Sequence, residues 1–230
     1  MDYKRNLKYF LGSDRWYYWG MAILAIGLTF FIGKMLSFRL FPYQMPIGLI
    51  LTIIGAFMAF IPKSRYSTEE EIDAALHIAV DAYTEEISNR LSLKQELIKN
   101  IETMTIADYI YRNDLLMRCG RIDRQCRTSL YSVSKIFCIK TGLVIASQTL
   151  SLINEMNDEN IVIYQFSDMD LVAVVDEEFV SKDHLKMKHS YFVIQKDSEE
   201  ILRLPAKHDV RIDEFCASIN ERIIEIHKIM

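Results

Sequence analysis

The fold of the C-terminal half depends on the stretch SLYSVSKIFCIKTGLVIA, residues 129–146. Residues 129–139 are rich in apolar and β-branched side chains, and this composition predicts one long strand. Thr141-Gly142 is typical of a turn, and residues 143–146 then begin a second strand of the same kind. The stretch therefore predicts two neighbouring antiparallel strands joined by a short turn.

Further strands are expected downstream, because short apolar runs alternate there with polar turns. Pro205 closes this series, and a helix follows at 210–228. About six strands in sequential order predict an antiparallel barrel or curved sheet that is closed by the C-terminal helix. The expected core comprises Tyr131, Ile136, Val144, Ile163, Leu171, Val174, Phe192, Ile194, Phe215 and Ile219.

Upstream of the strands, the region 67–104 is expected to be helical. Ser67 and Glu70 have the spacing of a capping box, and apolar residues repeat at helical spacing as far as Leu91. A second, shorter helix is expected from Ser92 to Ile101. Residues 105–124 are compatible with either helix or strand.

Two runs without charge stand near the N-terminus. Trp16–Gly33 spans 18 residues and Leu40–Pro62 spans 23. About 20 apolar residues in a helix cross a hydrocarbon core about 30 Å thick. The two runs therefore predict a hairpin of membrane-spanning helices, near residues 16–36 and 42–62.

The basic residues beside these runs predict an orientation. Six lie on the outer flanks and two in the connecting loop. Because basic residues favour the cytoplasmic side, both termini are expected in the cytoplasm of a cell with the hairpin in its inner membrane. The flanking residues are Lys4, Arg5, Lys8, Arg15, Lys63 and Arg65, and the loop residues are Lys34 and Arg39.

Charge divides the chain into unlike parts. Residues 66–230 contain 19 of the 27 basic residues and 29 of the 31 acidic ones, which gives them a net charge of −10. So acidic a region is a poor partner for a nucleic-acid polymer. The expected organisation is a hairpin domain at 1–65, a helical connecting region at 66–124, and a β-rich domain with its terminal helix at 125–230.

Small residues recur at helical spacing within both charge-free runs, and such rows let helices approach closely. They either pack the two helices of one hairpin together or form contacts between subunits. With the long apolar face after residue 67, they favour a homo-oligomer. The two rows are Ala22, Ala25, Thr29 and Gly33, and then Gly48, Thr52, Gly55 and Ala59.

Motifs that carry chemistry are absent from the sequence. The four cysteines show no C-x-x-C spacing and no histidine in a ligand pattern beside them, so neither a metal nor another cofactor is expected. In a cytoplasmic domain these cysteines are expected as reduced thiols. No glycine-rich phosphate loop or nucleophile elbow occurs, and the chain is therefore not expected to be an enzyme.

Arginines at 118, 121, 124 and 127 form the densest basic feature of the C-terminal part. Arginine side chains match phosphate geometry, so a small phosphate-bearing ligand is one interpretation of this cluster. The other interpretation pairs the arginines with the acidic face of the helix after residue 67. The four residues are Arg118, Arg121, Arg124 and Arg127.

The segment Arg127-Thr128-Ser129-Leu130-Tyr131-Ser132-Val133 resembles a pattern in bacterial pleckstrin-homology-like (GRAM-like) domains. The turn at Gly142, the run Phe166-x-x-Met169-Asp170-Leu171-Val172 and the terminal Ser218-Ile219-Asn220 share this resemblance. It covers roughly residues 125–230. It implies a binding or regulatory module, a class that often accompanies transmembrane helices. A weaker resemblance is to two-helix membrane effectors of bacterial antiviral defence.

Two functions are open at this point. The first is a membrane effector that senses a ligand or partner, oligomerises and perturbs the bilayer. The second is a passive membrane-tethered adaptor whose pleckstrin-homology-like domain binds a protein or lipid. The small-residue rows favour the first function, whereas the lack of charged residues within the spans favours the second.

Overall fold

The computed structural model describes residues 1–12, 15–35, 43–60, 66–91, 103–120, 123–182 and 184–229. Its contacts divide the chain into two compact units, Asp2–Ile72 and Asp73–Met230. Helix α4 (Glu69–Leu91) begins in the first unit and continues into the second. The two units are described separately below.

The first unit is helical, and its short helix α1 (Tyr3–Leu11) is capped by the side chain of Asp2. Ser67 is buried and donates a hydrogen bond of 2.7 Å to Asn6. The capping box of α4 therefore uses Thr68 and Glu71, one residue later than the sequence predicts. The backbone N–H of Thr68 and of Glu71 each donate to the other's side chain, at 2.9 and 3.1 Å.

Helices α2 (Arg15–Met35) and α3 (Gln44–Phe60) pack closely through glycines. A Cβ atom added at Gly27 would lie 2.5 Å from the backbone nitrogen of Thr52, and one added at Gly48 would lie 2.8 Å from that of Phe31. Real side chains do not tolerate such distances. Glycine is therefore what allows the two helix backbones to come together.

The two predicted small-residue rows fall in different places. Gly48, Thr52, Gly55 and Ala59 of α3 face α2. On α2, by contrast, Ala22, Ala25 and Thr29 are exposed and Gly33 is half-buried. Helix α2 instead presents Gly20 and Gly27 to its partner.

The prediction of a membrane hairpin is wrong. Over the ranges that the structure describes, no helix is both long and apolar enough to cross a membrane. The second charge-free run overstates its helix: the run spans 23 residues, whereas α3 occupies only 17, or about 26 Å. In α2 the first turns hold Arg15 and four aromatic residues with polar edges. The predictions of an inner-membrane location and of an orientation across that membrane depend on the hairpin and are therefore wrong as well.

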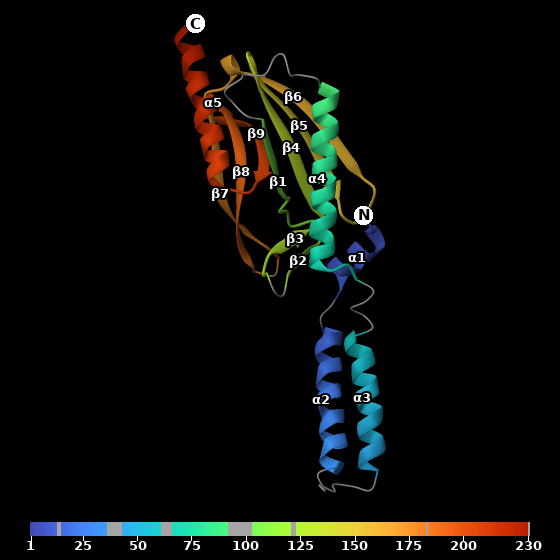
Figure 1. Ribbon diagram of the computed structural model, residues 1–230. Coiled ribbons are helices and arrows are strands. Elements are labelled where there is room, and N and C mark those ends of the chain that lie inside the picture. The colour runs from blue at the N-terminus through green and yellow to red at the C-terminus, as the bar shows by residue number, and fades with distance from the viewer. Residues whose placement is uncertain are drawn as a thin grey trace. The chain divides into compact units, whose positions relative to one another are not determined.

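The second unit contains nine strands, all paired antiparallel in the described part (Figure 1). A four-stranded sheet has the order β1-β4-β5-β6, a three-stranded sheet the order β7-β8-β9, and β2 and β3 form a small hairpin. The ambiguous region 105–124 thus contributes strands. The bounds are β1 Met104–Tyr109, β2 Met117–Cys119, β3 Cys126–Thr128, β4 Leu130–Ile139, β5 Gly142–Ser151, β6 Asn157–Gln165, β7 Leu171–Val180, β8 Lys186–Lys196 and β9 Glu199–Ala206.

The main core lies between the two larger sheets and helix α5 (Val210–Ile229). The amide side chain of Asn220 holds α5 to β7, since it accepts from the N–H of Val172 at 2.8 Å and donates to its C=O at 2.7 Å. These bonds satisfy backbone groups on the free edge of β7. The core is made by Ile136, Cys138, Leu143, Ile145, Phe192, Ile194, Ile212, Phe215 and Ile219, among others.

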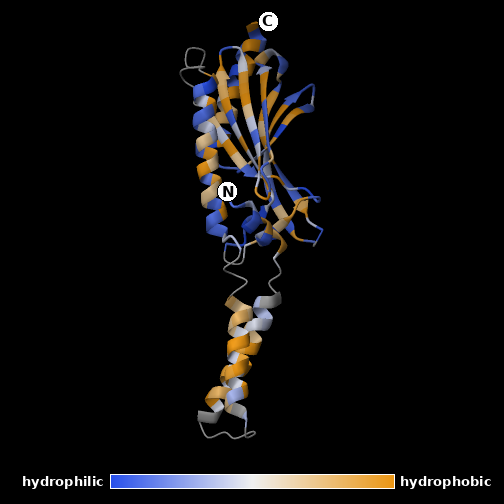
Figure 2. Ribbon diagram, turned by 90° about the vertical axis from the view of Figure 1, so that its right-hand side faces the viewer, coloured by the Kyte–Doolittle hydropathy of each residue, from blue (hydrophilic) through white to orange (hydrophobic). Residues whose placement is uncertain are grey.

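Helix α4 lies along the opposite face of the four-stranded sheet (Figures 1 and 2). Successive residues of a strand point to opposite faces, so Val133 and Ala146 are turned away from the main core, yet both are fully buried. Leu76, Tyr83 and Ile87 of α4 are buried as well. The apolar face of α4 is therefore used inside its own chain.

Most of the expected core residues are buried, with two clear exceptions. Ile163 is 62% exposed and Leu171 is 41% exposed. Both lie on edge strands, β6 and β7, and face away from the main core. The helix predicted at 92–101 lies outside the described residues.

Candidate binding groove

The inner face of the four-stranded sheet, which is the face that carries Ile136 and Ile145, changes character halfway along β4 and β5. Ile136 is paired with Ile145 in register, whereas the next inward pair is Ser134 and Ser147. The two serine hydroxyls are hydrogen-bonded at 2.9 Å. The polar half of the face comprises Asp108, Ser132, Ser134, Ser147, Thr149, Asp158 and Asn160.

A groove of about 450 Å³ lies between this polar half and strand β9. Ile145 and Leu204 contribute apolar surface, while hydroxyl, amide and guanidinium groups and the carboxylate of Asp158 contribute polar surface. The volume lies within the range of small-molecule sites. The lining residues with polar side chains are Tyr111, Arg112, Ser132, Ser147, Thr149, Asp158, Asn160, Tyr191 and Arg203.

Arg203 is held firmly in the wall of the groove. It forms a two-bond ion pair with Glu177 and a second pair with Glu200 at 2.8 Å. Its guanidinium carbon lies 4.4 Å from the ring centroid of Tyr191, a cation–π geometry. The hydrogen bonds to Glu177, the largest effect, raise the pKa of Arg203 and lower that of Glu177. Arg203 is thus fixed in position, with its N–H donors engaged by these two carboxylates.

Arg112 is the more available of the two groove cations. It pairs with Asp114, two residues away, at 3.1 Å, and both side chains are exposed. An exposed pair of this kind is worth little free energy, so a ligand anion can replace the carboxylate at small cost.

An aromatic row adjoins the groove beside Tyr191. The ring of His189 lies 4.8 Å from Tyr191 and 5.5 Å from Tyr111, and Phe179 packs against both Tyr111 and His189. His189 is buried, and its Nδ1 atom has no hydrogen-bond partner. Burial lowers the pKa of His189, and this effect exceeds the opposing attraction of Glu177. The row gives this end of the groove an apolar boundary.

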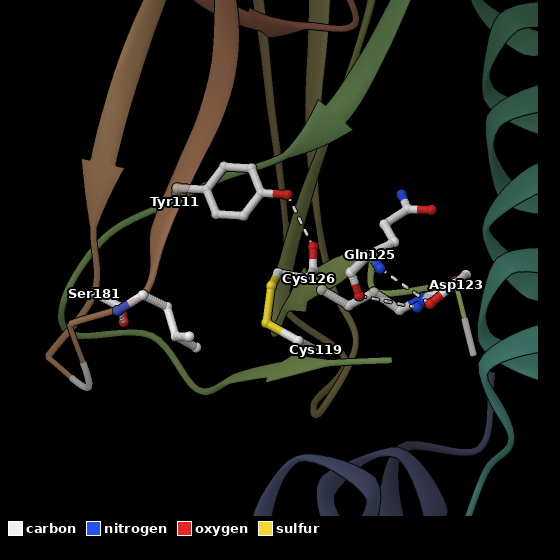
Figure 3. The surroundings of a disulfide bond; sticks show 8 residues. Tyr111, Cys119, Asp123, Gln125, Cys126 and Ser181 are labelled. Atoms are coloured by element: carbon white, nitrogen blue, oxygen red, sulfur yellow. Dashed lines mark hydrogen bonds and ion pairs between the residues drawn. A yellow bond between two sulfur atoms is a disulfide. The ribbon is translucent and has the colours of Figure 1, made fainter. Parts of the chain in front are cut away.

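A disulfide bond lies beside Tyr111, one of the residues that line the groove (Figure 3). Cys119 on β2 and Cys126 on β3 are directly opposite in register and are joined, with a Cα–Cα distance of 3.8 Å. The prediction of four reduced thiols is therefore wrong for this pair, whose antiparallel register brings the sulfurs together. Cys138 and Cys216 are free and buried, and burial raises the pKa of their thiols to about 11 and about 12.

Next to this disulfide, Arg127 is almost fully buried between two carboxylates. Its Nε atom donates to Asp73 of α4 at 2.9 Å, and its Nη2 atom bonds both Asp73 and Asp123. The phenol of Tyr109 also donates to Asp73, at 3.2 Å. These bonds raise the pKa of Arg127, with Asp73 as the largest cause, and lower that of Asp123. We call Asp73, Arg127 and Asp123 the α4 latch.

Of the four predicted arginines, the structure brings Arg118 on β2 and Arg127 on β3 together, because the two residues are directly opposite in register. Arg127 is engaged in the α4 latch, as the alternative interpretation of pairing with the acidic helix expects. Arg118 lies on β2, Arg124 is exposed with a φ of 56°, and Arg121 lies outside the described residues. The arginines of the groove are instead Arg112 and Arg203.

A second polar constellation lies away from the groove. His208 contacts Asp176 through Nδ1 at 3.1 Å and Asp213 through Nε2 at 3.0 Å, while Ser190 donates to Asp176 at 2.7 Å. Ser190 is thus bonded to a carboxylate, and both ring nitrogens of His208 already have partners. A nucleophile requires the serine to be bonded to the base, so this arrangement joins β7 to the start of α5 instead.

Comparison with known proteins gives no match: no family model, no curated protein and no solved structure matches the chain. Among the residues that the structure describes, no three His, Cys, Asp or Glu side chains are grouped as metal ligands.

The sequence analysis missed the residues of the groove, although a signal was present. Ser132 and Ser134 interrupt the apolar pattern of β4 at alternate positions, and Ser147 and Thr149 do the same in β5. Polar residues at every second position place hydroxyls on one face of a strand. The register of β4 with β5 places Ser132 opposite Thr149 and Ser134 opposite Ser147, and this pairing brings the hydroxyls together.

Proposed function

We propose that the β-rich unit is a non-enzymatic binding module that takes up a small phosphate-bearing ligand in the groove between its sheets. The observation that carries this proposal is the inward row of hydroxyls beside Arg112 and Arg203. Arginine forks suit phosphate oxygens, and the hydroxyls of Ser132, Ser147 and Thr149 suit the polar remainder of such a ligand.

Binding experiments on the whole chain test this proposal, with AMP, ribose 5-phosphate and inorganic phosphate as probes. We expect at least one probe to bind saturably by calorimetry, and Arg112→Gln to weaken that binding about tenfold or more, because a hydrogen bond to a charged group is lost. Arg124→Gln is the matched control, since Arg124 is exposed and does not line the groove. No binding at millimolar concentration, or equal binding by the two variants, contradicts the proposal.

We also propose that copies of the chain associate through the helical hairpin. Its support is the row of large apolar side chains that α2 and α3 leave exposed after their glycines have packed together. An extensive exposed apolar surface marks an interaction site, and a second copy offers the same uncharged surface. The side chains include Trp19, Ile26, Ile32, Ile50, Ile53, Phe57 and Phe60.

Sedimentation velocity across micromolar concentrations tests this association. We expect the whole chain to sediment as an oligomer, and the double variant Ile50→Gln, Phe57→Gln to shift it toward the monomer. Met156→Gln is the control, because Met156 is 75% exposed in the other unit. A monomer at all concentrations excludes self-association while leaving the groove proposal untouched.

The pleckstrin-homology-like assignment remains part of the same proposal. Four strands, then three, then a terminal helix that closes the core are consistent with it. Under it, the module regulates through what it binds and performs no chemistry of its own.

A further inference from the structure

The β2–β3 hairpin is a small covalently closed ring. The disulfide between Cys119 and Cys126 joins the two ends of an eight-residue segment, 119–126. Both cysteines are half-buried, so a reagent in solution can approach them. The backbone N–H of Gly120 donates to the C=O of Gln125 at 2.8 Å, which is the hydrogen bond across the hairpin beside the disulfide.

The ring is linked to α4 through Arg127. Asp123 lies inside the ring and is bonded to Nη2 of Arg127, which follows the ring directly. Arg127 in turn holds Asp73 of α4 through two further bonds. Closure of the ring thus keeps Asp123 opposite a guanidinium that is only 1% exposed. If the ring opens, this buried cation loses one of its two carboxylates.

The ring also contacts the groove, through Tyr111. The phenol of Tyr111 donates to the backbone C=O of Cys126 at 2.9 Å, and the dashed line in Figure 3 marks this bond. Tyr111 lines the groove and packs against His189 of the aromatic row. A shift of the Cys126 backbone would therefore also move Tyr111, whose side chain lines the groove.

We propose that the Cys119–Cys126 disulfide is a redox site that controls the groove and the α4 latch together. A dithiol reductant supplies two electrons and two protons; its own sulfurs become a disulfide, while the Cys119–Cys126 bond breaks into two thiols. The opened hairpin releases Asp123 from Arg127 and moves the carbonyl to which Tyr111 is bonded. The reduced chain then holds α4 less firmly and binds its ligand more weakly.

The other two cysteines take no part in this exchange. Cys138 and Cys216 are buried in the main core, and their raised pKa values keep them as thiols. The chain thus has one exchangeable pair among its four cysteines. The effect on the ligand rests on the proposed function of the groove, whereas the effect on α4 does not.

Hydrogen exchange of the whole chain, oxidised and after treatment with a dithiol, tests the redox site without any ligand. We expect reduction to speed exchange of the 104–120 and 123–131 peptides and of the first turns of α4 by about tenfold, with β5 unchanged. The double variant Cys119→Ser, Cys126→Ser is expected to show the fast exchange in both conditions. Arg124→Gln, which leaves both cysteines in place, is expected to respond as the natural sequence does.

The outcomes separate the two proposals. If mass spectrometry after alkylation finds Cys119 and Cys126 unpaired under oxidising conditions, or if reduction leaves exchange in the latch unchanged, the redox site is overturned. With AMP as the probe, we expect binding to weaken about threefold or more on reduction, and the double serine variant to bind equally weakly in both conditions. Equal AMP binding by the oxidised and reduced chains overturns the control of the groove. Absence of AMP binding in every form counts against the groove alone, because the exchange experiment needs no ligand.

Discussion

The inner face of the four-stranded sheet has one apolar half and one polar half, and the two halves differ sharply in their surroundings. Ile136 and Ile145 lie in the half closed by α5, and Ser134 and Ser147 lie one pair further along the same two strands. Strand direction and register are identical in both halves. Side-chain polarity therefore distinguishes the core from the polar half: the apolar pairs are packed away from water, whereas the buried Ser134 has its hydroxyl hydrogen-bonded to that of the half-buried Ser147.

The largest expected effect comes from the main core that covers the closed half, to which β8 of the other sheet contributes Phe192. Phe192→Ala removes a fully buried ring from the main core, and we expect a loss of about 3–5 kcal/mol in the free energy of unfolding. Ser147→Ala in the open half is expected to cost about 1 kcal/mol, the worth of one hydrogen bond. Urea denaturation of both variants measures the difference. Equal losses would show that the two halves are equally important to the fold.

A second comparison sets the α4 latch against the exposed arginine beside it. Arg127→Met leaves Asp73 and Asp123 without their cation, and we expect a loss of about 2–3 kcal/mol, since both carboxylates retain partial contact with water. Arg124→Gln is expected to change stability by about 0.5 kcal/mol or less. Denaturation curves decide this; a loss below 1 kcal/mol for Arg127→Met would mean that α4 is held by its apolar face alone.

Extending the apolar half into the groove tests whether polarity alone defines the site. In the double variant Ser134→Val, Ser147→Val, both partners of a hydrogen bond are replaced by apolar groups of similar size. Such a replacement is nearly neutral, so we expect a change of about 1 kcal/mol or less, together with loss of probe binding. Unfolding and calorimetry on the same preparation separate the two effects. Retained binding would show that the Ser147 hydroxyl does not contact the ligand.

Part of this fold could be predicted from sequence. The period of two in residues 129–146 identifies β4 and β5 and their turn, because local pattern and chain direction determine a hairpin. The same pattern cannot predict whether the apolar side chains of an edge strand are buried by another element. Ile163 is paired in register with the buried Val144, yet it is mostly exposed because β6 is the last strand of its sheet.

The site was harder to predict, because it depends on contacts distant in sequence. Arginines every third residue suggest a cluster, and Arg118 and Arg127 do lie opposite each other in register, but Arg127 is bound to Asp73 of α4, a contact that is distant in sequence. The disulfide likewise depends on the register of β2 with β3, which no local motif encodes. The membrane prediction failed because a lack of charge fixes neither helix length nor hydropathy: α3 is shorter than its charge-free run, and α2 begins with Arg15 and four aromatic residues.

The smallest expected effects are two opposite responses to pH, one beside each half of the sheet face. Burial lowers the pKa of His189, so the folded chain prefers the neutral ring. Its contribution to stability is complete above the unfolded pKa of about 6.5 and is lost as pH falls toward the lower folded value. We expect His189→Gln to flatten the acid side of the stability profile between pH 5 and 7.

For His208 the sign is reversed. Hydrogen bonds to Asp176, and then to Asp213, raise its pKa, so the folded chain prefers the protonated ring. Its contribution is complete below about pH 6.5 and is lost as pH rises through the folded pKa. Because the ring is 38% exposed, we expect His208→Gln to remove about 0.5 kcal/mol or less, and only on the acid side of that transition. Denaturation at pH 5, 6, 7 and 8, with NMR titration of both rings, measures the pair. If the two histidines changed stability with pH in the same direction, their surroundings would be electrostatically alike. The contrast between the closed and open halves would then depend on packing alone.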